Sequence, residues 1–156
     1  GPTTTLPATA FMSAAPEVLV VVANEPTSIM DAYALIKTLN KSPDPPVITA
    51  VINMVRTVEE GFQLAQRLNA ITQRYLGLDL PVGGIVPYDD KVVTAIRLRR
   101  PVMVHAATSA PACALDSIAE FVVSGRSYMR VGPRSQDALF GKLLSLGQTR
   151  KEAASS

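Results

Sequence analysis

The sequence has a single cysteine, Cys113, and a single histidine, His105, and it has no tryptophan. One cysteine cannot form an intrachain disulfide, which is typical of a protein of the cytosol. One cysteine and one histidine are also too few for a zinc site built from these residue types. A Ser-His-Asp triad would have to use His105, and no nucleophile-elbow motif accompanies it. We therefore predict no metal site and no catalytic triad.

Long apolar runs are absent too. The longest is Val18–Ala23, far shorter than the roughly 18–20 residues that a membrane span needs. The start lacks a basic region followed by an apolar core, so no secretory signal is expected. Gly1-Pro2 is typical of a cleaved tag, and residues 1–8 are expected to be a tag scar or a disordered start. The formal net charge of +2 is weak grounds for a nucleic-acid partner, and none is predicted.

The sequence also lacks the glycine-rich loop that binds nucleotide phosphates. No Gly-x-x-x-x-Gly-Lys-Ser/Thr motif occurs, and Gly83-Gly84 is not followed by Lys-Ser or Lys-Thr. No aspartate follows an apolar strand at the place of a magnesium-holding carboxylate. We therefore predict no catalytic residue and no nucleotide hydrolysis by this chain alone.

Apolar runs and helical patterns alternate along the chain. The runs are apolar on both faces, which predicts buried parallel strands. Strands are expected at Val18–Ala23, Val47–Val55 and Leu80–Val86, the last interrupted at Gly83-Gly84. Helices are expected at Thr9–Ala15, Asp31–Asn40 with Ser28 as N-cap, Val58–Tyr75, Asp89–Arg99 and Ala110–Val123 with Gly125 as C-cap. This alternation predicts an α/β fold with a doubly wound parallel sheet.

Three strands make a thin sheet for this fold class. The chain also begins with a helix that has no strand ahead of it. We therefore expect that the N-terminal half of a larger domain is absent. The strand Leu19–Ala23 is then expected to have an unpaired edge, and exposed edges favour self-association or poor solubility.

Polar loops follow each of the three strands, at Asn24–Ser28, Asn53–Arg56 and Pro87–Asp90. The carboxyl ends of parallel strands share one rim, where α/β proteins bind ligands. An Asn side chain at this rim can pair with the edge of adenine, and Pro87 with its neighbours can form a wall beside the ring. From the residues alone, alternatives stay open: Asn53 can cap a helix or bond a loop, and Tyr88 can be a core aromatic.

Four segments carry a resemblance to a known family: Asn24–Lys37 with its Glu-Pro-Thr-Ser-Ile-x-Asp-Ala-Tyr stretch, Asn53–Arg56, Glu59–Gly61 and Val86–Asp90. They closely resemble FlhG (FleN), the MinD-like ATPases that control flagellar number and placement in bacteria. The resemblance runs from about Ala10 to Val123. It implies a partial P-loop NTPase (MinD-like) fold over residues 9–125 that lacks the N-terminal P-loop half with Walker A and Walker B.

The resemblance also implies roles for particular residues. Asn53 would contact adenine, and the other cofactor-binding positions would be Arg56, Pro87, Tyr88 and Asp89. Glu25 and Asp31 would lie near the surface where two ATP-bound subunits meet, although Asp31 can equally favour the N-terminus of its helix. The intact family binds ATP or ADP with Mg²⁺; this chain alone is expected to bind none.

The partners implied by the resemblance are a second subunit in a homodimer, an FlhF-like GTPase and flagellar basal-body components. The implied location is the cytoplasm, peripherally at the inner face of the plasma membrane. An alternative of a different class is a non-catalytic protein-interaction module derived from the same fold.

The tail, residues 126–156, contains an amphipathic pattern over 135–146 with basic flanks. Its apolar stripe includes Leu139, Phe140, Leu143 and Leu144. MinD-like proteins have such a C-terminal membrane helix, and a basic amphipathic helix can lie in a membrane interface. The stripe can equally pack on the domain or on a partner. The sequence leaves both interpretations open.

Overall fold

Three parallel strands form the centre of the molecule in the computed structural model, which describes residues 6–124. They are β1 (Glu17–Ala23), β2 (Val47–Val55) and β3 (Val82–Pro87), in the order β1-β2-β3. Both strand pairs are parallel, as predicted. Gly125, the predicted helix at 135–146 and its membrane-facing residues Leu139, Phe140, Leu143 and Leu144 lie outside the described residues.

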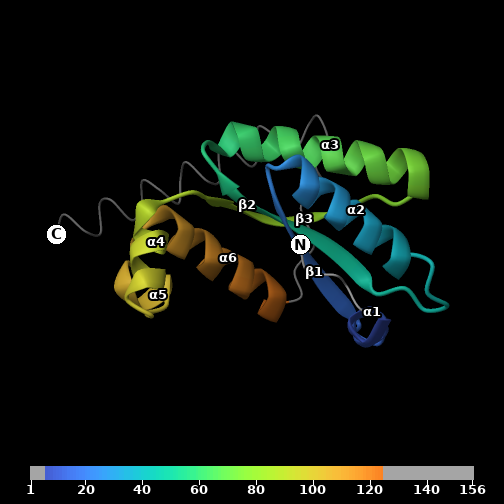
Figure 1. The fold of residues 1–156 in the computed structure, drawn as a ribbon, viewed down its shortest axis with the longest axis horizontal. Helices are drawn as coiled ribbons and strands as arrows, with labels where there is room; N and C mark the ends of the chain where they lie inside the picture. The colour runs from blue at the N-terminus through green and yellow to red at the C-terminus, as the bar shows by residue number, and fades with distance from the viewer. Residues whose placement is uncertain (1–5, 125–156) are drawn as a thin grey trace.

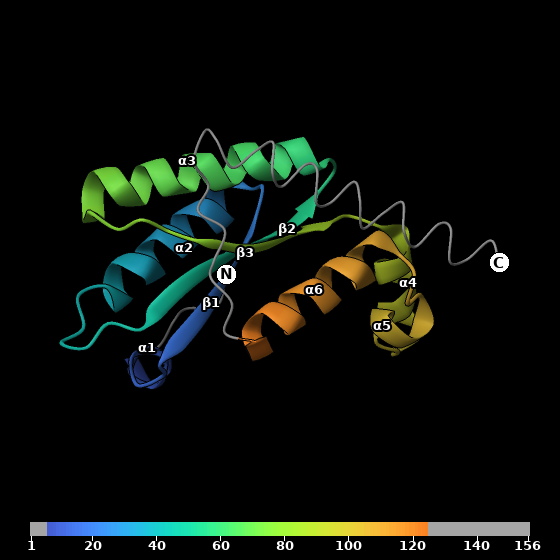
Figure 2. The same cartoon turned by 180° about the vertical axis from the view of Figure 1, so that it is seen from behind.

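Helices cover both faces of this sheet (Figures 1 and 2). They are α1 (Leu6–Ser13), α2 (Pro26–Leu39), α3 (Val58–Leu76), α4 (Asp90–Arg97), α5 (Val102–His105) and α6 (Ala110–Ser124). α2 and α3 lie on one face, α6 lies on the other, and α4 with α5 lies at one end. The arrangement confirms the predicted α/β class with helices on both sides of a parallel sheet. Within residues 6–124 no helix is both long enough and apolar enough to cross a bilayer.

The larger core lies between the sheet and the α2/α3 layer. Val22, Ile36, Ile52, Leu64 and Leu68 have no exposed side-chain surface there. Burying each such side chain contributes about 1.5–3 kcal/mol. A smaller core lies under α6, where Ile118 packs against β2 and β3. The two cores hold the strand ends in fixed relative positions.

β1 is the least covered strand. It pairs with β2 only, so it forms one edge of the sheet within residues 6–124. Leu19 and Val21 point away from the α2/α3 layer and are 42% and 59% exposed. Their partners on β2, Thr49 and Val51, are buried on that same face. α6 therefore covers the second face over β2 and β3 but not over β1.

Several local predictions were wrong. α2 begins at Pro26, not Asp31, because proline suits the first helical position. Ser28 is not the N-cap: it lies in the first turn, and its Oγ accepts a hydrogen bond of 3.0 Å from the Ala23 backbone N–H. Glu25 occupies the N-cap position instead.

The third strand also differs from its predicted form. β3 begins at Val82 and continues through the glycine pair. Ala50 pairs with Val82 and the next residue, Val51, pairs with Gly84, so Gly83 is an extra residue at a β-bulge. No pattern in the sequence predicted α5.

Candidate functional site

The ends of the three strands form one continuous rim. In the register of the sheet, Ala23 lies beside Asn53, and Asn53 lies beside Val86. The loops after these residues therefore start next to one another. This confirms the prediction that the polar loops share the carboxyl edge of the sheet.

Asn53 stands at an irregular point of β2. Asn53 pairs with Val86, whereas Val55 pairs with Pro87, so Met54 is an extra residue at a bulge. Met54 has a φ of 59°, a left-handed conformation that is unusual for methionine. Its backbone N–H donates a 2.9 Å hydrogen bond to Oδ1 of Asn53. Bulges often redirect side chains near binding sites, and this one fixes the Asn53 amide at the rim.

The loop after β3 is held by several short contacts. The Tyr88 backbone N–H donates to the Val55 carbonyl at 2.8 Å. The Tyr88 hydroxyl donates to Oδ1 of Asp90 at 2.8 Å, and this bond raises the pKa of the phenol. Asp89 is the N-cap of α4 and accepts from the Lys91 backbone N–H. The Tyr88 side chain is half exposed, so it is not a core aromatic.

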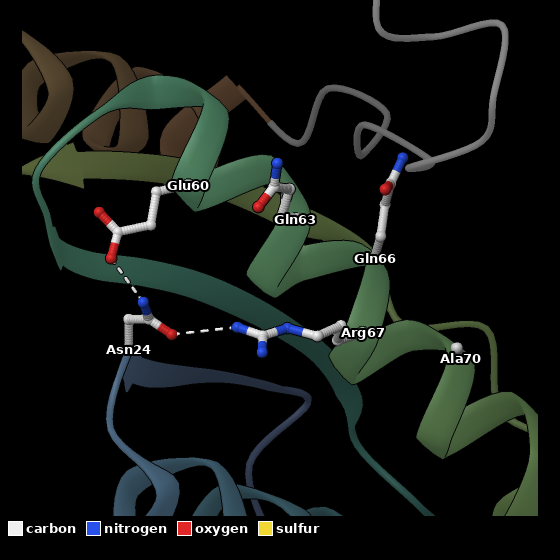
Figure 3. A pocket seen from close by; sticks show the side chains of 6 residues that line it. All are labelled: Asn24, Glu60, Gln63, Gln66, Arg67 and Ala70. Atoms are coloured by element: carbon white, nitrogen blue, oxygen red, sulfur yellow. Dashed lines mark hydrogen bonds between the residues drawn. The ribbon is translucent and has the colours of Figure 1, made fainter.

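A second polar network joins β1 to α3 (Figure 3). The Asn24 amide donates through Nδ2 to Oε1 of Glu60 and accepts through Oδ1 from the Arg67 guanidinium at 3.1 Å. Oε2 of Glu60 accepts a 2.8 Å hydrogen bond from the Arg56 backbone N–H. That bond, followed by the one from Asn24, lowers the pKa of the Glu60 carboxyl from its usual value of 4.5. The network ties the loops after β1 and β2 to one helix.

An open hollow of about 480 Å³ lies beside this network. Its lining residues, drawn in Figure 3, are Asn24, Glu60, Gln63, Gln66, Arg67 and Ala70. None of the five predicted cofactor-binding residues lines it. We call this feature the α3 hollow; sequence reasoning did not assign Asn24, Glu60 or Arg67 to a site. The spacing Thr57-x-x-Glu60, typical of a helix capping box, was the one local signal.

The remaining predicted residues are exposed and do not line the α3 hollow. The Arg56 side chain is exposed at the start of α3, and Glu25 and Asp31 are exposed on the N-terminal part of α2. The Glu25 side chain makes no capping hydrogen bond. The assignment of Glu25 and Asp31 to a dimer surface stays a prediction.

We expect Glu60→Gln to weaken the junction between β1 and α3 in a pH-dependent manner. The pKa of Glu60 is lowered by folding, so its stabilisation is full above pH 4.5 and is lost as the pH falls through the folded-state pKa. The urea midpoint of the wild type should exceed that of the variant above about pH 5. The two midpoints should converge in stronger acid.

The matched control is Glu59→Gln on the same turn of α3. Glu59 is exposed and accepts only a 3.4 Å contact from Gln63. If the urea midpoints of wild type and Glu60→Gln differ by the same amount at all pH values, the charged carboxylate has no role in this junction.

Comparison with known proteins places these features in context. The chain is 40% identical over 114 residues to the antiactivator FleN of Pseudomonas aeruginosa, a match that covers 73% of this chain and 41% of FleN. It therefore spans about two-fifths of the length of that relative. The fold resembles the MinD cell division protein of Aquifex aeolicus with a TM-score of 0.59 and 22% identity, over 80% of this chain and 50% of the other. No protein-family profile matches the chain.

Proposed function

This chain is a partial homologue of the FlhG/FleN proteins with a MinD-like fold, and from that premise we propose that it supplies the adenine-binding rim of a nucleotide-dependent flagellar regulator. The protein that contains it would bind ATP with Mg²⁺, dimerise, associate with the membrane and control flagellar number or placement. Because FleN is named an antiactivator, we extend an inhibitory role to this chain as part of the proposal. A second subunit, an FlhF-like GTPase and basal-body components are the proposed partners.

The position of Asn53 is the observation that carries this proposal. Its Oδ1 is engaged by the Met54 N–H, while its Nδ2 has no hydrogen-bond partner among residues 6–124. An amide in this state can donate to a ring nitrogen of adenine. Tyr88, half exposed on the neighbouring loop, offers an aromatic surface for a base.

Asn53 and Tyr88 provide no positive charge that would bind the phosphates of a nucleotide. The sequence has no glycine-rich phosphate loop, and a base contact without phosphate contacts gives weak affinity. We therefore propose that this chain alone recognises the base weakly and does not hydrolyse ATP. In the intact family the phosphate groups and Mg²⁺ are held by the P-loop half.

The test is a titration of the isotopically labelled 156-residue chain with adenosine, followed by amide chemical shifts. We expect shifts centred on Asn53 and on Val86–Asp89, with a dissociation constant on the order of 1 mM. Asn53→Leu should abolish them. Gln63→Leu, which changes the α3 hollow and leaves the rim intact, is the matched control and should not.

Two results would contradict the proposal. Shifts centred on Asn24, Gln63 and Arg67 would move the ligand site to the α3 hollow. Micromolar ATP binding with turnover by the purified chain would show that phosphate chemistry resides in these residues.

The proposed role in flagellar regulation is tested separately in a flagellated bacterium that carries the gene. Asn53→Leu in the chromosomal copy of the gene is expected to change the number or position of flagella seen by electron microscopy. The Gln63→Leu strain serves as control. Flagellation identical to wild type in the Asn53→Leu strain would contradict a regulatory role for the rim.

A further inference from the structure

α4 and α5 form a small projection at one end of the molecule (Figures 1 and 2). They contact each other, and α5 also contacts α6. Ala95 is the only buried residue of the two helices. The projection therefore contributes little to the core, and its side chains are left for another purpose.

Large apolar side chains are exposed on this projection. The exposed fractions are 69% for Ile96, 54% for Leu98, 37% for Met103 and 72% for Val104. Single exposed apolar residues are ordinary, whereas contiguous apolar patches mark interaction sites. Ile96 lies on α4, Leu98 is its C-cap, and Met103 and Val104 lie on α5, which contacts α4. We call these residues, together with Lys91, Arg97, Arg99 and Arg100, the α4–α5 surface.

The α4–α5 surface carries an excess of positive charge, although α4 begins with Asp90, whose carboxylate accepts from the Tyr88 hydroxyl. Lys91, Arg97, Arg99 and Arg100 are all exposed, and no Asp or Glu occurs between residues 91 and 109. The positive charge of Arg97 also acts on Tyr88. A surface with this excess of positive charge attracts acidic groups.

The end of α4 provides an independent observation. The Arg99 N–H donates to the Ile96 carbonyl and the Arg100 N–H donates to the Ala95 carbonyl, at 3.0 and 2.9 Å. This is the Schellman pattern, in which the residue with positive φ is usually glycine. Arg99 occupies that position with a φ of 52°. Unusual backbone conformations of this kind cluster at functional sites, and a binding role for the side chain explains why an arginine stands there.

We propose that the α4–α5 surface binds an acidic segment of a partner protein that also presents apolar side chains. Its carboxylates would pair with the arginine guanidinium groups, and its apolar residues would cover Ile96, Leu98 and Val104. Arginine and methionine are enriched in protein interfaces, and lysine is depleted. The surface has three arginines and one lysine. The proposal requires no nucleotide, although Arg97 acts electrostatically on Tyr88 of the rim.

Other occupants fit these observations less well. Nucleic acid would use the positive charge but not the four apolar side chains. Membrane-surface helices carry Trp, Phe or Leu on a continuous apolar face, whereas α4 has 8 residues, α5 has 4 and neither contains Trp, Phe or Leu. Residues 125–156 contain six Lys or Arg and two Asp or Glu, so the chain's own tail has the same sign as the surface.

The test measures binding of a fluorescent synthetic peptide whose helical form presents leucines on one face and glutamates on the other. The 156-residue chain is expected to bind it with a dissociation constant on the order of 10 µM. The same peptide with lysine in place of glutamate should not bind. Arg97→Glu/Arg100→Glu should weaken binding at least about tenfold, whereas Arg74→Glu, an exposed arginine on α3, should leave it unchanged.

A second variant separates binding from folding. Arg99→Gly suits the positive φ of this position, so the unfolding midpoint should stay the same or rise while peptide affinity falls several-fold. The proposal is overturned if the acidic peptide does not bind the wild type or binds the Arg97→Glu/Arg100→Glu variant equally well. Stronger binding to phosphatidylglycerol vesicles, lost in that variant, would overturn it in favour of a membrane surface.

Discussion

Gly84→Ala is expected to lower the free energy of unfolding by roughly 2–3 kcal/mol, the upper part of the roughly 1–3 kcal/mol range for overpacking a filled core. A Cβ atom at this position would lie 2.4 Å from Cγ1 and 2.7 Å from Cδ1 of Ile118. Ile118 is 8% exposed and packs α6 against β2 and β3. The helix must therefore move away from the sheet or Ile118 must leave its position. Urea unfolding followed by circular dichroism measures the loss.

Gly77→Ala is the matched control for this prediction. Gly77 ends α3 with a φ of 63°, and a Cβ atom there would have no neighbour within 4 Å. Its replacement should cost about 1 kcal/mol, from backbone conformation alone. The loss of unfolding free energy in the double variant Gly84→Ala/Ile118→Ala should be smaller than the sum of the two single losses, because Ile118→Ala removes the atoms that clash. Equal losses for Gly84→Ala and Gly77→Ala, or strict additivity, would contradict close packing as the cause.

The glycine pair illustrates what the sequence could and could not predict about the fold. The strand predicted at Val47–Val55 matches β2 residue for residue, because a long run rich in β-branched residues is typical of a buried strand. Gly83-Gly84 predicted an interruption of the strand, but β3 continues through both residues. The glycines instead allow α6 to approach the sheet, and nothing in the local sequence reveals that contact. The close approach depends on Ile118, more than thirty residues later. Tertiary contacts of this kind override local propensity.

The same distinction applies to the candidate site. The shared rim was predictable, because alternation of strands and helices places all strand ends at one edge. The network of Asn24 with Glu60 and Arg67 was not, since its partners are 36 and 43 residues apart and meet only once α3 lies across the end of β1. The left-handed residues Met54 and Arg99 gave no signal either, because glycine or asparagine is the usual mark of that conformation.

Self-association of the 156-residue chain through β1 is the second large effect that we expect. One side of the β1 backbone has no strand partner within residues 6–124. Leu19 and Val21 add exposed apolar surface on the same strand, at 42% and 59%. An unpaired edge with apolar side chains is a template for pairing with another chain. Sedimentation velocity should therefore show dimers or larger species that grow with concentration.

Val21→Lys should reduce this association by roughly tenfold or more, equivalent to about 1.4 kcal/mol. A lysine on an edge strand must keep its ammonium in water, which a second strand and its covering side chains would prevent. The fold should tolerate the change, because Val21 points away from the α2/α3 layer while its neighbours Val20 and Val22 remain in the core.

The control is Tyr75→Lys on the last turn of α3. Tyr75 is 63% exposed, comparable with Val21, but it belongs to a helix and not to the sheet edge. It should leave the sedimentation profile unchanged, which separates an effect of the β1 edge from a general effect of added charge. A wild-type chain that stays monomeric at all concentrations would refute the prediction. Equal dissociation by both lysine variants would assign the association to nonspecific apolar contacts, because edge pairing requires β1 and Tyr75 belongs to α3.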